Sequence, residues 1–282
     1  MKLVSFTYDE IMITCMSREI RNGDIAIQGL ATPMAIISYY LAKATHAPKT
    51  TIMQLAGNIL TYTKTPPQIS LLFNEFEAMK RSVHIGTQTE VYEVIFKRFE
   101  SIVEFFRPAQ IDMFGNTNNS LIESHISKLR LPGGFGIPDV AALYPRTLYY
   151  CPRHEKRVFV EKVDHIGGSG LIIKDEYHHK RDIHIISELG VFEIEHESKR
   201  MKLLSIHPGI KIENIRENTS FEILIPEKIQ KTSPPTELEL QLIREKIDPL
   251  NIRRLEYLSG KNRKDALLNI LDKELTQKFR IK

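Results

Sequence analysis

Two kinds of hydrophobic pattern alternate along the first sixty residues, helical spacing and short continuous apolar runs. Apolar side chains recur at helical spacing over residues 8–21 and 34–43, which predicts two helices. Short apolar runs at 25–27 and 51–55 follow these helices and stop at glycine-containing turns, which predicts two strands. This helix–strand–helix–strand order is typical of a parallel α/β sheet, whose functional loops gather at the strand ends.

The second half of the chain has a strand-rich pattern. Apolar and polar positions alternate over residues 157–163, and an apolar run at 170–173 follows a glycine turn, which predicts two strands. Three further apolar runs are separated by short polar turns and predict an antiparallel β-meander: 183–186, 191–194 and 201–206.

Helical periodicity returns at the end of the chain. Residues 236–247 predict a helix that stops at Asp248-Pro249, and a second amphipathic helix lies in the tail. We therefore expect an α/β fold, with an open, mostly parallel sheet, flanking helices and an antiparallel meander in the second half. We divide the chain into a domain of residues 1–252 and a basic amphipathic C-terminal extension of residues 253–282.

The charge of the chain is concentrated in that extension. Residues 253–282 carry nine Lys or Arg and four Asp or Glu, so the extension is +5, whereas the rest, with 30 bases and 31 acids, is −1. A protein that binds nucleic acid normally carries its basic face on the folded body, so we expect no nucleic-acid partner. For the tail helix we favour docking on its own body or on a partner subunit, with attachment to a membrane surface or to nucleic acid as the alternative.

Composition narrows the class of protein further. The chain has 282 residues, 42% of them hydrophobic and 26% charged, which is ordinary for a globular protein and unlike disordered or collagen-like chains. No apolar run approaches the roughly 18 residues that a membrane span needs, so we expect no membrane span. Cys15 and Cys151 lie far apart outside any CxxC motif, which favours a reducing, cytoplasmic compartment.

A glycine-rich loop is the first candidate site. Gly133, Gly134, Phe135 and Gly136 precede a short helical stretch that starts at Asp139. Glycines allow consecutive backbone N–H groups to point at an anion, so the loop suits a phosphate or a developing oxyanion. A structural turn is an equally good interpretation, and the GxGxxG pattern of dinucleotide-binding proteins is absent.

Asparagines and histidines supply two further candidates. Asn116 and Asn118 lie in a polar loop between apolar segments, where they either orient a substrate carbonyl or only complete a tight turn. His154-Glu155 begins like a zinc-binding HExxH helix, but position 158 is a valine. A second group, His178-His179 with His184, has no nearby cysteine, so we expect no metal site.

Four segments together carry a resemblance to a known family. They are Ala109-Gln110-Ile111-Asp112 with Gly115-Asn116-Thr117-Asn118, the loop 133–136, residues 154–159, and Leu242-Ile243-Arg244 with Ile247-Asp248-Pro249. In these segments the chain resembles the β subunit of family I CoA-transferases, of the glutaconate CoA-transferase kind, and the resemblance covers about residues 8–250. Further segments at 191–192, 205–209 and 218–221 are most similar to the branch that hydrolyses ring-containing CoA thioesters in steroid degradation.

The resemblance implies an open α/β fold, an α subunit of similar fold as partner, and an active site between the two subunits. It also implies that an acyl-CoA thioester is the substrate and that no further cofactor takes part. Transferases of this family use a glutamate at the end of an early strand, which forms an acyl anhydride and then a glutamyl–CoA thioester. Here that place reads Gln54-Leu55-Ala56-Gly57, so either Gln54 or Leu55 stands where the nucleophile is expected.

Three functions are compatible with this replacement. The first is a β subunit of a heteromeric CoA-transferase-like enzyme that acts on acyl-CoA thioesters. The second is a hydrolase that cleaves a cyclic CoA ester with water and without a glutamyl–CoA intermediate; in it the loop 133–136 would hold the thioester oxygen and an α-subunit glutamate would manage the proton. The third is a non-catalytic subunit that binds acyl-CoA or only its partner.

Overall fold

A computed structural model describes residues 5–62, 67–123, 127–171 and 181–279. The chain forms two compact units. Residues 1–97 and 235–282 make up the first unit, and residues 98–234 make up the second. The predicted division at residue 252 stays a prediction, although it falls inside a short 3-10 helix, η4 (Ile252–Glu256).

Four strands form the sheet of the first unit. β1 (Ile25–Gln28) and β2 (Thr51–Gln54) are parallel and in full register, from Ile25 opposite Thr51 to Gln28 opposite Gln54. β3 (Ile59–Thr61) pairs antiparallel with β2, and β4 (Ser82–Ile85) pairs antiparallel with β3. The predicted parallel pair is therefore confirmed.

The first two helices begin where the sequence places their caps. α1 (Tyr8–Arg18) starts with a capping box between Thr7 and Glu10, and α2 (Pro33–Ala44) has a proline in its first turn. The two helices pack on each other. Their buried apolar side chains, including Ile11, Met16 and Ile37, form much of the core of this unit.

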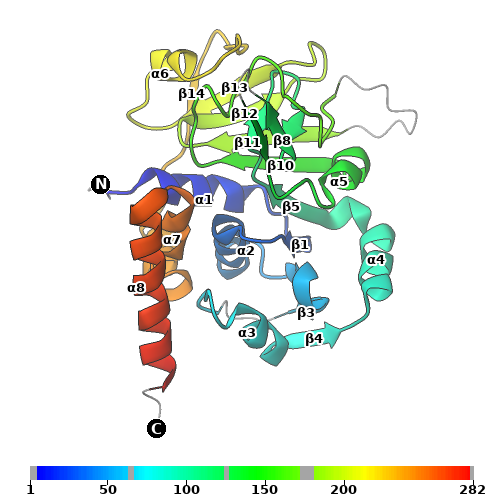
Figure 1. The fold of residues 1–282 in the computed structure, drawn as a ribbon, viewed down its shortest axis with the longest axis vertical. Coiled ribbons are helices and arrows are strands. Elements are labelled where there is room, and N and C mark those ends of the chain that lie inside the picture. Colours follow the sequence, from blue (N-terminus) through cyan, green and yellow to red (C-terminus); the bar gives the residue numbers. More distant parts are fainter. Residues whose placement is uncertain (1–4, 63–66, 124–126, 172–180, 280–282) are drawn as a thin grey trace. The chain divides into compact units, whose positions relative to one another are not determined.

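The other helical elements of the first unit come from two parts of the chain (Figure 1). They are η1 (Leu55–Gly57), α3 (Asn74–Lys80), α4 (Gln88–Lys97), α7 (Glu237–Gln241), its π-helical continuation η3 (Leu242–Ile247), η4 and α8 (Gly260–Phe279).

The tail helix α8 docks on its own unit. Its Ile270 is buried, and its Glu274 carboxylate accepts hydrogen bonds from the amides of Leu71 and Leu72 at 2.9 and 3.0 Å and from the Ser70 hydroxyl at 3.0 Å. A carboxylate that accepts several hydrogen bonds fixes the chain more firmly than an apolar contact alone. The favoured prediction for the tail was docking on its own body or on a partner subunit, and the structure shows docking on its own body.

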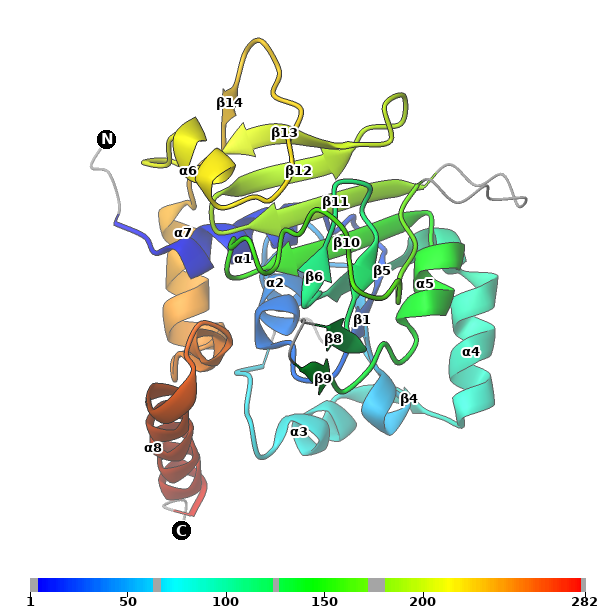
Figure 2. The same ribbon diagram turned by 45° about the horizontal axis from the view of Figure 1, so that its top comes forward.

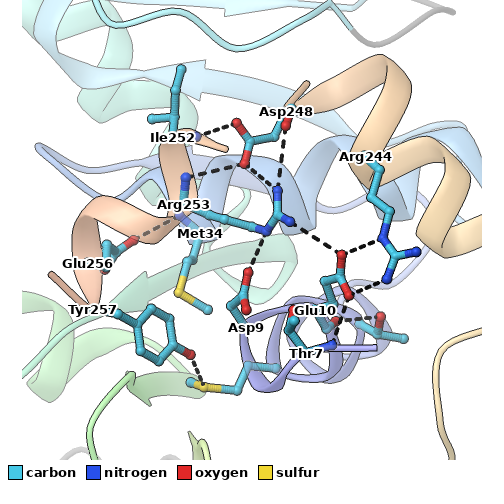
Figure 3. A network of polar contacts seen from close by, with 12 residues as sticks. Thr7, Asp9, Glu10, Met34, Arg244, Asp248, Ile252, Arg253, Glu256 and Tyr257 are labelled. Atoms are coloured by element: carbon cyan, nitrogen blue, oxygen red, sulfur yellow. Dashed lines mark hydrogen bonds and ion pairs between the residues drawn. The ribbon is translucent and has the colours of Figure 1, made fainter. Parts of the chain in front are cut away.

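A buried ion network joins the C-terminal segment to α1 (Figure 3). The Arg253 guanidinium, with its side chain 5% exposed, contacts Asp9 at 2.5 Å, Asp248 at 2.8 Å and Glu10 at 3.3 Å. Arg244 binds both oxygens of the same Glu10 carboxylate, at 2.7 and 2.8 Å. Burial raises the pKa of Glu10, but the bonds from Arg244 and Thr7 and the charges of Arg253 and Arg244 outweigh it and leave this pKa below its usual value.

Six strands form the main sheet of the second unit (Figure 2). The first three are parallel, β12 and β13 continue as an antiparallel meander, and β14 returns parallel to β13. In spatial order they are β5 (Ile102–Phe106), β10 (Arg146–Cys151), β11 (Asp182–Ser187), β12 (Gly190–Ile194), β13 (Met201–Ile206) and β14 (Gln230–Lys231). The α/β class and the antiparallel meander are confirmed.

Short elements complete the second unit. Two small hairpins and three helical segments surround the main sheet. They are β6 (Gln110–Ile111) with β7 (Thr117–Asn118), β8 (Leu121–Glu123) with β9 (Lys128–Arg130), η2 (Phe99–Ser101), α5 (Ile137–Leu143) and α6 (Ile212–Glu217).

The strand predicted at 157–163 is wrong. Within this segment a single bridge joins Phe159 to Ile111, and the amides of Val158 and Phe159 both donate to the Glu155 carbonyl, which closes a turn. The alternation arises because Phe159 and Val163 are buried from an irregular backbone. Half of the strand predicted at 170–173 lies outside the described residues, since residues 172–180 are not described; Leu171 lies in a turn.

Among the described residues, no helix combines the length and the apolar character that crossing a membrane requires.

Candidate active site

Two glutamines end the parallel strands of the first unit. Gln28 and Gln54 are register partners at the last positions of β1 and β2. Register partners on neighbouring strands point to the same face of a sheet, so these two side chains lie next to each other. The carboxyl ends of parallel strands are the usual place for a binding site in an α/β protein.

Several amide atoms at these strand ends are buried without partners. Gln54 is only 3% exposed, and neither Oε1 nor Nε2 of its side chain has a hydrogen-bond partner among the described residues. In the same part of the chain, Gln28 Oε1 and Asn58 Oδ1 are also buried and unpartnered. Each such atom costs about 1–3 kcal/mol, and folded proteins retain few of them. The register partners Gln28 and Gln54, both with unpartnered amide atoms, are therefore a candidate site for a polar group.

Asn58 lies in the turn between β2 and β3. It caps η1 in the left-handed region, at φ 50°, and it directly precedes Ile59, the register partner of Gln54 on β3. Asparagine tolerates this backbone conformation better than most residues. Sequence interpretation did not single out Gln28, because only the strand register places it beside Gln54.

The two positions proposed for the missing nucleophile differ in structure. Gln54 is the last residue of β2 and is buried, whereas Leu55 is half-buried and begins η1. Neither side chain is ionisable. Of the two, Gln54 occupies the strand end at which the resemblance places a glutamate.

The predicted glycine loop lies in the second unit. Gly133 and Phe135 have positive φ values of 107° and 47°, and the Phe135 side chain is 75% exposed. The Gly133 amide donates to the Asn119 carbonyl at 3.0 Å. Among the described residues, the amides of Gly134, Phe135 and Gly136 donate to no backbone carbonyl, so the loop presents three N–H groups before α5.

The predicted asparagines are buried and fully bonded. Asn116 donates to Asp112 Oδ2 at 3.0 Å and accepts from the Gly170 amide at 2.8 Å. Asn118 donates to Gln110 Oε1 at 2.7 Å and accepts from the Ser120 amide at 2.9 Å. Both side chains therefore hold the loop 110–120 in shape, which is what the tight-turn alternative describes.

A second group of glycines, Gly167, Gly168 and Gly170, serves packing. A Cβ atom added to Gly170 would lie 1.9 Å from the Phe114 carbonyl oxygen, and one added to Gly168 would lie 2.6 Å from Thr117 Oγ1. Only glycine fits such close approaches to neighbouring atoms. By contrast, an added Cβ at Gly136 meets nothing within 4 Å, so the first cluster is not constrained by packing in this way.

His154 is a core residue. Its ring stacks on Phe159 with 3.6 Å between centroids, and its two nitrogens lie 2.8 and 2.9 Å from the hydroxyls of Ser187 and Thr219. Burial lowers the pKa of His154 to about 3, so the ring is neutral at physiological pH. The described residues contain no group of three or more His, Cys, Asp or Glu side chains placed to hold a metal; His178 and His179 lie outside those residues.

Glu104 is a buried acid that sequence interpretation missed inside an apolar segment. It lies in β5, is 5% exposed, and burial raises its pKa to about 8, so the carboxyl group is mostly protonated at neutral pH. Phe105 pairs with Leu148 across β5 and β10, so Glu104 stands beside Thr147. The Thr147 hydroxyl is itself buried without a partner among the described residues.

The candidate residues are divided between the two units. Gln54 and Leu55 belong to the first unit, and Asn116, Asn118 and the glycine loop belong to the second. Within the second unit, the hydrogen bond from the Gly133 amide to the Asn119 carbonyl joins the glycine loop to the loop 110–120.

Comparison with known proteins gives one consistent result. Residues 10–218 match the family model of coenzyme A transferase. The chain is 27% identical over 247 residues to the B subunit of 3-oxoadipate CoA-transferase from Pseudomonas knackmussii, covering 85% of this chain and 93% of that protein. It is 34% identical over 154 residues to the cholesterol ring-cleaving hydrolase IpdB subunit of Rhodococcus jostii, covering 52% of this chain and 60% of that protein.

A solved structure extends the comparison to the fold. The crystal structure of the decarboxylase AibA/AibB superposes with a TM-score of 0.75 at 26% identity, covering 88% of this chain and 98% of that chain. Because the family model spans well over half of the sequence, the chain belongs to the coenzyme A transferase family.

Proposed function

We propose that this chain is the β subunit of a heteromeric enzyme that acts on acyl-CoA thioesters together with an α subunit of the same family. The observation that carries this proposal is the match to the B subunit of 3-oxoadipate CoA-transferase over 93% of that protein's length. The two-component name of the AibA/AibB structure supports the heteromer. Coenzyme A enters as part of the substrate, and the proposal includes no resident cofactor.

Gln54 favours a second candidate, which is cleavage of the thioester by water. A carboxamide is not a nucleophile that forms an acyl anhydride, so the two-step transfer through a glutamyl–CoA thioester lacks its attacking group on this chain. The similarity to the ring-cleaving hydrolase subunit agrees with this route, and a cyclic acyl group is the corresponding substrate. A purely scaffolding subunit would have no need to keep costly unpartnered amides at its strand ends.

The glycine loop has a proposed role in the same chemistry. Its three N–H groups would stabilise the negative charge that develops on the thioester oxygen, where one donor is typically worth about 3 kcal/mol of barrier. Asn116 and Asn118 would orient the substrate through the loop that they fix, since their own amide groups are already bonded. Both roles remain proposals.

We also propose a cytoplasmic location. Cys15 and Cys151 are both buried free thiols, which suits a reducing compartment.

Co-expression with the α subunit tests the function. The purified complex is assayed with a panel of acyl-CoA thioesters that includes 3-oxoadipyl-CoA, both for exchange of labelled acid into the thioester and for release of free thiol without an acceptor acid. Exchange, with inactivation by borohydride in the presence of acyl-CoA, indicates transfer. Thiol release without inactivation indicates hydrolysis. Absence of both reactions in a correctly assembled complex contradicts the enzymatic proposal.

A further inference from the structure

The unpartnered atoms at the ends of β1 and β2 define what they bind. They comprise two acceptors, Oε1 of Gln28 and Oε1 of Gln54, and one donor group, Nε2 of Gln54. Matching ligands must therefore supply two hydrogens and accept at least one.

The numbers of donors and acceptors exclude several chemical groups as the ligand. A carboxylate or phosphate offers acceptors only and would face two carbonyl oxygens of like partial charge. An ammonium group supplies hydrogens but leaves the Gln54 amide hydrogens without an acceptor. A thioester carbonyl takes up only those hydrogens and leaves both oxygens unpaired. Water both donates and accepts, so water molecules satisfy both kinds of atom.

We propose that Gln54 and Gln28 hold the water molecule that attacks the thioester carbon of the substrate. The proposal rests on the hydrolytic form of the proposed function. The water accepts from Gln54 Nε2 and donates one hydrogen to Gln28 Oε1, which leaves one lone pair free for attack and one hydrogen free for a base. A second water donates to Gln54 Oε1.

The reaction balances with this single co-reactant. The water oxygen bonds to the thioester carbon, and the carbon–sulfur bond breaks with its electron pair on the coenzyme A sulfur. One water proton ends on that sulfur, and the other leaves the acid product to solvent. A carboxamide neither takes nor releases these protons, so the two glutamines position the water and a base outside this pair receives the free proton.

The strands make the positioning rigid. Gln54 pairs with Gln28 on one side and with Ile59 on the other, so the backbone of β2 is fixed between two neighbours at the residue that points to the water. Sites on paired strands hold geometry better than sites on free loops. Misplacing a reacting group by about 1 Å costs on the order of 100-fold in rate, which sets the expected size of the effect.

Gln54→Met in the complete complex tests the proposal, with Thr50→Val as the matched control. Thr50 precedes β2 at its opposite end and also has a buried hydroxyl without a partner among the described residues. We expect Gln54→Met to lower the kcat for thiol release about 100-fold with little change in KM and no loss of thermal stability. We expect Thr50→Val to change kcat less than twofold.

Outcomes of this pair separate the inference from the proposed function. If the wild-type complex releases thiol and Gln54→Met does so at the same rate, the water site is wrong and the hydrolytic function stands. If the wild-type complex cleaves no thioester, the function itself fails. Equal losses of kcat in both variants would assign the effect to the fold of β2 and would also overturn the water site.

Gln54→Glu gives a test that does not depend on loss of activity. If residue 54 reaches the water that attacks the thioester carbon, a carboxylate there reaches the carbon itself. The variant complex should then form a borohydride-sensitive thioester on residue 54 with the same acyl-CoA panel, located by peptide mass spectrometry. A folded Gln54→Glu complex that binds acyl-CoA but shows no such adduct would place residue 54 away from the reacting carbon and overturn the proposal.

Discussion

Replacing Arg253 by methionine tests how the C-terminal segment is held on the first unit. The Arg253 side chain is buried and contacts three carboxylates, those of Asp9, Glu10 and Asp248 (Figure 3). Methionine keeps much of the volume but removes the charge. Glu10 retains Arg244, whereas the fully buried Asp248 side chain loses the ion pair that offsets its burial.

The loss of stability in Arg253→Met should be large because the buried Asp248 carboxylate is left without its partner. Breaking a buried pair from one side typically costs about 3–5 kcal/mol, and we expect Arg253→Met to lower the free energy of unfolding by that amount at pH 7. For a chain of this length this corresponds to a fall in Tm of roughly 6–20 °C. Arg244→Met is the matched comparison: Arg244 is 42% exposed and leaves Glu10 paired with Arg253, so we expect about 1 kcal/mol.

Urea unfolding followed by circular dichroism measures both variants, with hydrogen exchange of η4 and α8 as a local readout. The double variant Arg253→Met with Asp248→Asn should recover part of the loss, because the uncompensated carboxylate is gone. A loss below 1 kcal/mol for Arg253→Met, or unchanged exchange in η4, would refute the conclusion that this network holds the segment in place.

Three further predictions concern the second unit. Burial keeps the pKa of His154 near 3, below the usual 6.5, so the free energy of unfolding should fall as pH drops below 6.5, by about 2–3 kcal/mol at pH 4.5. Urea titrations at several pH values should show that His154→Gln removes this dependence of stability on pH. Burial raises the pKa of Glu104 to about 8, so the free energy of unfolding should fall as pH rises from 4.5 through 8. At pH 9 the Glu104→Gln variant should be more stable than the wild type by about 3–5 kcal/mol. A stability difference between variant and wild type that is the same at pH 5 and pH 9 would contradict this. Gly170→Ala should unfold the chain or cost several kcal/mol, whereas Gly136→Ala should stay within about 1 kcal/mol, as thermal melts can show.

Local periodicity was sufficient to predict the elements with one buried face. The strands β12 and β13 alternate in burial, and the structure has them and β11 close to the predicted bounds. The helices α1 and α2 also lie close to their predicted bounds because their apolar residues recur at helical spacing, although most residues of both helices are buried. The strand β10 was missed because all six of its residues are buried, so that Arg146–Cys151 shows no alternation. The strand at 157–163 was predicted wrongly because Phe159 is buried beside His154 from an irregular turn, and this burial produces the same alternating pattern as a strand.

The candidate site was predictable only in part. The position of Gln54 followed from the resemblance, since a glutamate is expected at that strand end. Gln28 was not found, because its place beside Gln54 depends on strand register. Asn116 and Asn118 have the residue type of substrate contacts, but in the structure their hydrogen bonds are used within their own loop.

The hydrolytic candidate and the proposed water site both depend on one claim, that this chain takes part in direct cleavage of an acyl-CoA thioester by water. A single turnover of the complex in ¹⁸O-labelled water, followed by mass spectrometry of product and protein, tests it most directly. The account predicts one ¹⁸O atom in the released acid and none in any carboxylate of the enzyme. Incorporation of ¹⁸O into a glutamate or aspartate of either subunit would show an acyl-enzyme anhydride and contradict the account.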